Sequence, residues 1–191
     1  MIIGITGGTG CGKTTALQVF GELGGTVLDC DAIYHRLLVT DKVLLTTIES
    51  RFPGVVQDGV LDRKKLGTIV FADPDALSDL NAITHTAVKN EVLHQVKAAD
   101  GHVAIDAIAL FESGLAELCD ETVAVTAPED CRTRRLMLRE GISEAYARAR
   151  IAAQKPQTEL CAMCGHRLEN DGTPEQFRQK CLAFFNGLGI I

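Results

Sequence analysis

The residues best suited to chemistry lie at the start of the chain, in the sequence GGTGCGKT of residues 7–14. Its glycines permit backbone conformations that a Cβ atom would forbid, so successive N–H groups can turn inward around an anion. Lys13 can reach the outer phosphates of a nucleotide, and the Thr14 hydroxyl can coordinate Mg²⁺. The spacing satisfies the phosphate-loop pattern and predicts a site for a nucleoside triphosphate with Mg²⁺.

Carboxylates form a second group of candidates, because they end two short apolar runs. Asp29 and Asp31 end one run, and Asp106 follows residues 103–105. An acid at the end of a strand can orient Mg²⁺ or its waters in phosphate-loop proteins, which makes Asp106 a metal candidate. Asp29 is equally compatible with a turn. Position alone leaves two interpretations of Asp31 open, a chemical role or the N-cap of a helix over residues 32–39.

The pattern around these side chains indicates an α/β scaffold. An apolar run over residues 2–5 leads into the loop, and a helical pattern over residues 13–20 leads toward the run that ends at Asp29. Strand, helix and strand at this spacing form a βαβ unit, whose sheet is parallel. Ligands of such sheets bind at the carboxyl ends of the strands, which is where the loop and the carboxylates are expected.

Residues 40–100 are mostly helical in pattern and carry no strand of comparable strength. We interpret residues 35–98 as a helical insertion beside the sheet. His85 within it is more typical of a surface or hydrogen-bonded core residue than of a ligand. Further strands are expected over residues 103–106, 121–126 and 167–169, and further helices over residues 62–71, 128–139 and 143–154, from Pro74 and from Thr173.

A basic run follows the strand expected over residues 121–126. Between residues 132 and 155 seven cations oppose two acids, in a chain whose net charge is -6. Arg135 and Arg139 are four residues apart and project from one face of a helix. Arginines on a closing segment can neutralise the charge of a transferred phosphoryl group. We therefore expect residues 135–158 to form a basic lid; a solvated basic helix face is the alternative.

Length and composition set further limits. A chain of 191 residues suits one domain with insertions, and its 46% hydrophobic and 23% charged residues are ordinary for a soluble protein. The net charge of -6 argues against a nucleic-acid partner, and no apolar run reaches the roughly 20 residues of a membrane-spanning helix. Seven cysteines without framework spacing and no recognisable signal peptide predict a cytoplasmic protein with reduced thiols. The sequence does not determine the oligomeric state, and a monomer is the expectation.

The phosphate loop is shared by kinases, GTPases and ATPase motors. A GTPase should carry a base-recognition segment of the type Asn-Lys-x-Asp, and a transporter-type ATPase should be longer and carry a signature loop. The sequence has neither of these segments. Small size, a helical insertion and a basic lid favour a metabolite kinase.

Several motifs, in order along nearly the whole chain, resemble those of the dephospho-CoA kinase family. They are GITGGTGCGKT over residues 4–14, LDCD over 28–31, LNAITH over 80–85, ID over 105–106, LFE over 110–112, Arg135, Arg139, Arg150-Ile151, Gln154 and NDG over 170–172. The chain departs from the family pattern at Thr86, where proline is usual, and at Ile108 and Ala109, where Pro-Leu is usual.

The resemblance implies a P-loop three-layer α/β fold with a parallel sheet of about five strands, in which the insertion binds the acceptor. It implies transfer of the ATP γ-phosphoryl group to the ribose 3′-hydroxyl of dephospho-CoA, the last step of coenzyme A synthesis. Asp31 would be the base at that hydroxyl. The other expected site residues are Gly10, Cys11, Gly12, Lys13, Thr14 and Thr15 for ATP, Thr14 and Asp106 for Mg²⁺, Lys13 and Arg139 for catalysis, and His85 and Arg135 for the acceptor.

Two other functions stay open from the sequence. One is a kinase for a different small acceptor, such as a nucleoside or a nucleotide, which an ADP-release assay across acceptors would distinguish. The other is a nucleotide-dependent switch or binding module without enzymatic activity. Slow hydrolysis independent of any small acceptor would be the sign of such a switch.

Overall fold

The computed structural model of the protein describes residues Met1–Ile190. The chain divides into two compact units. One consists of Met1–Leu28 together with the residues from Ala99 onward, and the other consists of Asp29–Ala98. The first unit contains the phosphate loop.

A five-stranded sheet in the order β2-β5-β1-β6-β7 forms the centre of the fold. Strand β1 pairs in parallel with both β5 and β6, and β6 pairs in parallel with β7. The parallel α/β sheet expected from the sequence is therefore confirmed. The strands are β1 (Ile2–Thr6), β2 (Thr26–Asp29), β5 (Val103–Asp106), β6 (Glu121–Thr126) and β7 (His166–Glu169).

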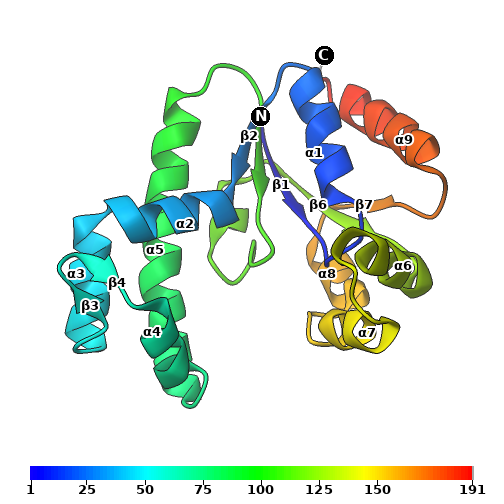
Figure 1. Cartoon of the computed structure of the whole chain (residues 1–191). Helices are drawn as coiled ribbons and strands as arrows, with labels where there is room; N and C mark the ends of the chain where they lie inside the picture. Colours follow the sequence, from blue (N-terminus) through cyan, green and yellow to red (C-terminus); the bar gives the residue numbers. More distant parts are fainter. Residues whose placement is uncertain (191) are drawn as a thin grey trace. The chain divides into compact units, whose positions relative to one another are not determined.

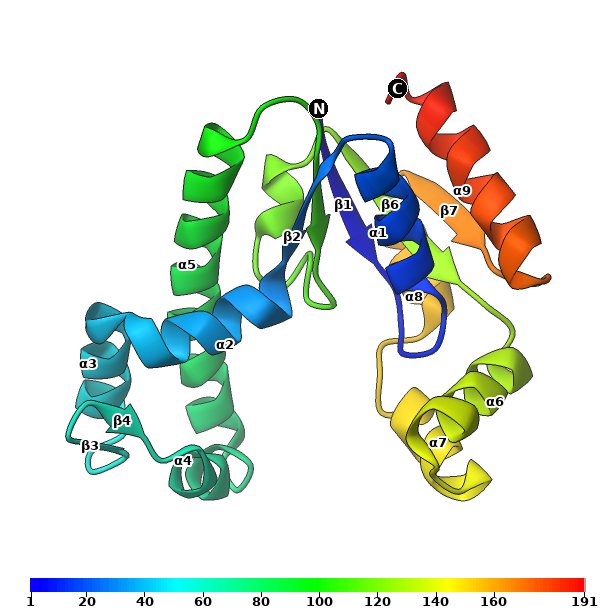
Figure 2. The ribbon, with the colours of Figure 1, turned by 45° about the horizontal axis from the view of Figure 1, so that its top comes forward.

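Helices cover both faces of the sheet in the first unit. Helices α1 (Lys13–Glu22) and α9 (Pro174–Gly187) lie side by side on one face, and α8 (Gln157–Met163) lies against β6 on the other (Figures 1 and 2). The rings of Phe20 and Phe185 pack edge to face with centroids 5.3 Å apart between α1 and α9. Both are fully buried in the main apolar core, which also includes Ile3 and Ile5 of β1. The core thus fixes both elements that flank the loop.

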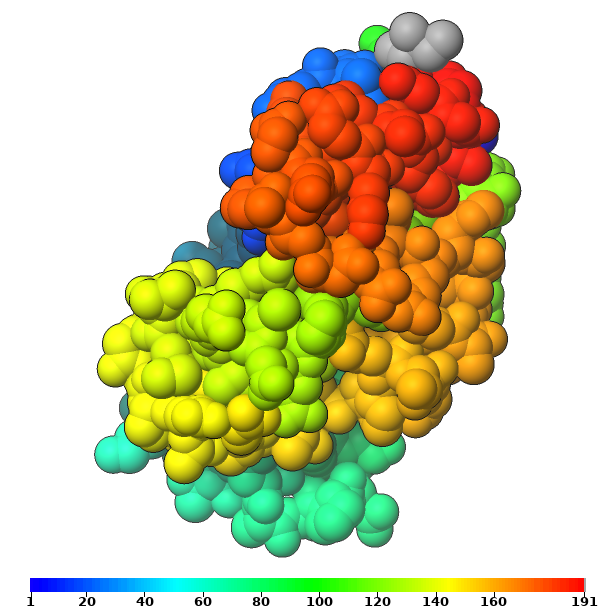
Figure 3. All heavy atoms as spheres, turned by 90° about the vertical axis from the view of Figure 1, so that its right-hand side faces the viewer, coloured from blue at the N-terminus to red at the C-terminus, as the bar shows by residue number. Residues whose placement is uncertain are grey.

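Three short helices follow β6 in the first unit. Helix α6 (Glu129–Glu140) and helix α7 (Glu144–Ala152) pack on each other through the buried Leu136 and Ile151. Ser143 caps α7, as the sequence predicts. Figure 3 shows α6, in yellow-green, and α7, in yellow, as a continuous surface that borders α8 and the residues before α9. Helix α8 was not predicted from the sequence. The pattern indicates that Pro156 ends the preceding helix, whereas in the structure Pro156 is the N-cap residue of α8.

The unit Asp29–Ala98 is built mainly from helices. The 25-residue helix α5 (Pro74–Ala98) buries every fourth residue over most of its length, from Ala76 through Leu80 to Val92. A hairpin of two strands with two residues each, not expected from the sequence, forms where the chain turns at Asp58 with φ 52°. The other elements are α2 (Cys30–Thr40), α3 (Lys42–Arg51), β3 (Val56–Gln57), β4 (Val60–Leu61) and α4 (Arg63–Val70).

None of the helices in the described part of the chain combines the length and the apolar character needed to cross a bilayer.

Candidate active site

The phosphate loop connects β1 to the amino end of α1. Gly12 is the N-cap residue of α1 and has φ 105°, a conformation that residues with a Cβ rarely adopt. Within Met1–Ile190 the backbone N–H groups of Gly10, Gly12 and Thr14 donate to no protein acceptor. Unpaired N–H groups at the start of a helix, together with the helix dipole, form a site for an anion. The loop therefore has the donors that a polyphosphate requires.

Arg135 and Asn170 hold the outer side of this loop. Arg135 donates from Nη1 to the backbone oxygen of Gly10 over 3.2 Å and from Nη2 to Oδ1 of Asn170 over 2.9 Å. Nδ2 of Asn170 donates to the backbone oxygen of Cys11 over 2.9 Å. The described bonds of Arg135 thus go to the loop and its support, and the acceptor contact expected from the sequence stays a prediction.

Asn170 is a site residue to which sequence reasoning assigned no role. It follows β7, is only 5% exposed, and fits against Gly12, where an added Cβ would collide with its side-chain amide. The sequence shows Asn170 within the motif NDG, which reads as a turn. The only signal available was the order of the family motifs, because the partner, Cys11, is 159 residues away.

Lys13 and Asp106 meet beside the loop. Nζ of Lys13 lies 3.7 Å from Oδ1 of Asp106, and both side chains are mostly buried, at 16% and 21% exposure. Asp106 ends β5 and is in register with Ile5 of β1, the strand that leads into the loop. The carboxyl ends of these two strands therefore bring the predicted metal residue next to the phosphate-binding lysine. Thr14, the other metal candidate, is exposed in the first turn of α1.

The basic segment carries less free charge than its composition suggests. Arg139 is 60% exposed and donates to Glu140 over 2.6 Å, and Arg150 also pairs with Glu140. Hydrogen bonds from both arginines hold the pKa of the Glu140 carboxyl below its usual value. Arg148 pairs with Glu144 and with two acids at the start of α6 that lie outside the counted run. A catalytic role of Arg139 stays a prediction, since its guanidinium now bonds to a carboxylate.

The acid that caps helix α2 is Asp29, which corrects the sequence-based alternative for Asp31. Oδ1 of Asp29 accepts a hydrogen bond from the N–H of Ala32 over 2.9 Å, so α2 starts at Cys30 rather than at residue 32. Asp31 lies in the first turn, is exposed, and has no hydrogen-bond or ion-pair partner among the described residues. Its carboxylate is therefore not engaged in capping.

Comparison with known proteins identifies the family. A family model of dephospho-CoA kinase matches residues 1–176. The chain belongs to the dephospho-CoA kinase family. The dephospho-CoA kinase of Geobacillus kaustophilus is 38% identical, with 96% of this chain and 94% of that protein covered. The dephospho-CoA kinase of Anaeromyxobacter dehalogenans is 40% identical, with 94% and 88% covered.

Solved structures agree with this membership of the dephospho-CoA kinase family. The structure of TT1252 from Thermus thermophilus has a TM-score of 0.80 and 33% identity, covering 98% of this chain and 97% of that one. The dephospho-CoA kinase from Campylobacter jejuni has a TM-score of 0.69 and 26% identity, covering 98% and 96%. Shikimate kinase from Bacteroides thetaiotaomicron, at a TM-score of 0.55 and 18% identity, shares the fold alone. The family and the P-loop kinase fold expected from the motifs are both confirmed.

The chain's departure from the dephospho-CoA kinase pattern at Thr86 has a structural consequence. Helix α5 continues through this position, and Oγ1 of Thr86 donates to the backbone oxygen of Ala82 over 2.8 Å. A proline there would lack the N–H needed to continue the helical bonding. His85 is half-buried within the same continuous helix and has no hydrogen-bond partner in the described residues. Its acceptor contact stays a prediction.

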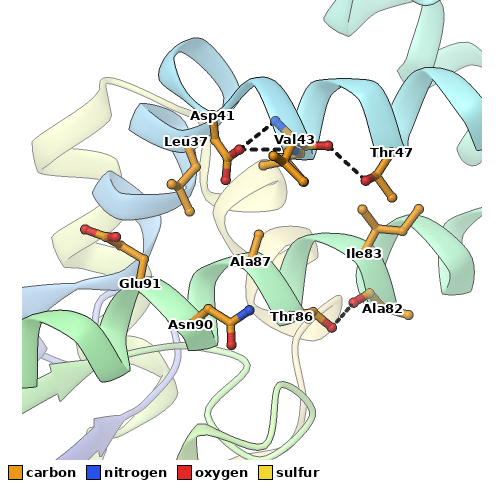
Figure 4. Close-up of a pocket in the computed structure, with 11 residues that line it drawn as sticks. Leu37, Asp41, Val43, Thr47, Ala82, Ile83, Thr86, Ala87, Asn90 and Glu91 are labelled. Atoms are coloured by element: carbon orange, nitrogen blue, oxygen red, sulfur yellow. Dashed lines mark hydrogen bonds between the residues drawn. The ribbon is translucent and has the colours of Figure 1, made fainter.

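A groove of about 590 Å³ lies within the helical unit, between α2, α3 and α5 (Figure 4). Leu44 and Ile83 contribute to its apolar wall, and no Lys, Arg or His lines it. Its two acids are already engaged, since Asp41 caps α3 and Glu91 pairs with Arg36 over 2.7 Å. Without a cation, this groove is unsuited to the phosphates of an acceptor.

Proposed function

We propose that this protein transfers the γ-phosphoryl group of ATP to the ribose 3′-hydroxyl of dephospho-CoA and so forms coenzyme A. The observation that carries the proposal is the family match over residues 1–176, which includes the phosphate loop with its unpaired N–H donors. The basic segment and the helical unit suit the same reaction. Phosphoryl transfer mainly requires positioning of the two substrates and neutralisation of charge on the transferred group.

ATP binding is assigned to the loop and the first turn of α1, residues 10–15. Backbone N–H groups would hold the phosphate oxygens, and Lys13 would leave Asp106, at 3.7 Å, to neutralise the outer phosphates. Thr14 and Asp106 would hold Mg²⁺, whose role is to neutralise charge on the polyphosphate. No group of three or more His, Cys, Asp or Glu suited to a metal occurs in Met1–Ile190. Mg²⁺ commonly takes most of its ligands from phosphate and water, so two protein ligands are sufficient.

Asp31 is proposed as the general base that accepts the proton of the 3′-hydroxyl. Its support is chemical: the carboxylate is exposed and has no described partner, and Asp29 performs the capping that would otherwise occupy it. A positioned base typically contributes about 10²- to 10⁴-fold to rate. A residue in this role needs a carboxylate oxygen that is accessible to the hydroxyl proton.

The unit Asp29–Ala98 is proposed to bind the acceptor, with His85 and Arg135 as acceptor contacts, and Arg139 is proposed to face the reacting phosphates. Release of Arg139 from Glu140 would give a guanidinium able to bind phosphoryl oxygens in pairs. Residues 135–158 would then act as the lid.

The direct test is an assay with Mg-ATP and dephospho-CoA in which coenzyme A is measured by chromatography. A panel of nucleosides and nucleotides is run in parallel with ADP release as the common signal. Coenzyme A formation with the highest kcat/KM for dephospho-CoA supports the proposal. Faster transfer to a nucleoside or nucleotide would indicate a different acceptor, and ADP release that no acceptor accelerates would indicate a switch.

A further inference from the structure

Arg132 is a buried arginine of α6, with 4% of its surface exposed. Its Nε donates to the backbone oxygen of Thr9 over 2.9 Å, and its Nη2 donates to Oε1 of Gln154 over 3.2 Å. The same Oε1 accepts from the N–H of Thr9 over 2.8 Å. Residues from three distant parts of the chain therefore form a closed ring, which occupies both backbone polar groups of one residue in the phosphate loop.

The bond from Arg132 fixes the orientation of one peptide group in the loop. No peptide bond in the described residues is cis, and in a trans peptide the C=O and N–H groups point in opposite directions. Since the oxygen of Thr9 faces Arg132, the N–H of Gly10 faces the opposite side of the loop. That N–H has no acceptor in Met1–Ile190. Arg132 thus sets the direction of an amide that is available to an anion.

The charge of Arg132 also favours an anion in the phosphate loop. Its described hydrogen bonds go to neutral oxygens, those of Thr9 and Gln154. Glu129, in the first turn of α6, pairs with Arg148 instead. Burial lowers the pKa of Arg132 because desolvation disfavours its positive charge, and Cys11 and Glu129 oppose this shift only in part. A buried cation without a carboxylate partner is costly, and a polyphosphate in the loop would compensate it.

We propose that Arg132 is a positioning residue for phosphoryl transfer, which holds the Thr9–Gly10 peptide so that the N–H of Gly10 faces the polyphosphate. Gln154 supports it by bonding both Arg132 and the N–H of the preceding Gly8–Thr9 peptide. This inference rests on the proposed function, because it takes the loop to bind ATP. Gly8 leaves the space that the arrangement needs, since an added Cβ there would collide with the guanidinium of Arg132. Gln154 lies just after α7, so the ring also connects the phosphate loop to residues 135–158.

The first test replaces Arg132 by methionine and by lysine and compares both with Arg134→Met. Arg134 is an exposed neighbour on the same helix, with no described bond to the loop. Loss of a charged hydrogen bond predicts that Arg132→Met weakens binding of a non-hydrolysable ATP analogue by about 10- to 100-fold. Arg132→Lys keeps the charge but loses the planar fork, so its loss should be intermediate. KM for dephospho-CoA should change by no more than about twofold in each variant, because the ring contacts only the nucleotide loop.

The second test uses the other member of the ring. Gln154→Glu keeps an oxygen that can accept both hydrogen bonds, so KM for ATP should stay within about threefold of the parent protein. Gln154→Leu removes that oxygen and should raise KM for ATP by about tenfold. The double variant Arg132→Met/Gln154→Leu should lose no more ATP affinity than the weaker-binding of the two single variants, because both changes act on Thr9.

Each outcome decides for or against Arg132. Analogue binding by Arg132→Met that equals that of the parent protein, or a lower melting temperature as the only change, overturns the inference. An equal loss in Arg134→Met also overturns it, because general basicity would then be the cause. Where Arg132→Met does not fold, a difference in KM for ATP between Gln154→Glu and Gln154→Leu supports the ring, and equal values overturn it. A parent protein that makes no coenzyme A refutes the proposed function alone, since analogue binding still tests Arg132.

Discussion

Replacing Gly12 by alanine should damage the nucleotide site through two effects that the structure makes explicit. The residue has φ 105° and ψ 20°, and an alanine in so sparsely populated a region costs about 1–3 kcal/mol. The new Cβ would also displace the amide of Asn170 from the backbone oxygen of Cys11, at a cost of about 0.5–1.5 kcal/mol. The combined cost is about 1.5–4.5 kcal/mol. If the loop of the variant keeps its conformation, this cost lowers the free energy of unfolding. If the loop relaxes in the nucleotide-free protein, the cost appears instead as weaker ATP binding.

Denaturant unfolding and titration with a non-hydrolysable ATP analogue measure the two losses, and their sum is compared with the expected total. Gly21→Ala is the matched control, because Gly21 lies in the same helix α1 and an added Cβ there meets nothing within 4 Å. Alanine at Gly21 should raise the free energy of unfolding by about 0.5–1 kcal/mol and leave ATP affinity unchanged. A combined loss under about 0.5 kcal/mol for Gly12→Ala, the range of an ordinary surface substitution, would refute the reasoning.

Three further predictions follow from single side chains. Asp31→Asn should lower kcat by at least about tenfold with ATP affinity unchanged, whereas Asp29→Asn should stay active because asparagine also caps helices; equal kcat values for the two would contradict the role of Asp31. Lys13→Ala should fold, as judged by circular dichroism, and show no detectable turnover; activity near that of the parent protein would remove Lys13 from the mechanism. The backbone N–H groups of Gly54 and Val56 donate to Glu49 and hold the pKa of its carboxyl below its usual value of 4.5, so these bonds stabilise the fold above that pH and are lost as the pH falls through the lowered value. The unfolding midpoint of Glu49→Gln should therefore lie below that of the parent protein at pH 7 and converge with it in acid; a constant difference across pH would be the contrary result.

The loop and the parallel sheet were predictable because their signals are local. The spacing of glycines, Lys13 and Thr14 occupies eight residues, and the central strands β1, β5 and β6 contain short apolar runs. The cap of α2 was not predictable, because Asp29 and Asp31 suit an N-cap equally well by composition. The choice depends on where the backbone leaves the extended conformation, and that occurs at Asp29, the last residue of β2.

The support of the loop could not be derived from the sequence, because its partners are distant in the chain. Helical spacing places Arg135 on a face of α6 but does not show that this face meets Gly10, which is 125 residues away. Arg132 was one of seven cations in a basic run and had no feature that marked it as buried. Side chains that contact the outer side of a loop are set by tertiary packing, which local patterns do not encode.

The central claim is tested most directly by determining the product formed from Mg-ATP and dephospho-CoA. The phosphate position is assigned by ³¹P NMR, and Lys13→Ala serves as the inactive control. The account predicts one coenzyme A, phosphorylated at the ribose 3′-hydroxyl, for each ADP released. ADP release without coenzyme A, or a phosphate at another position, would contradict it.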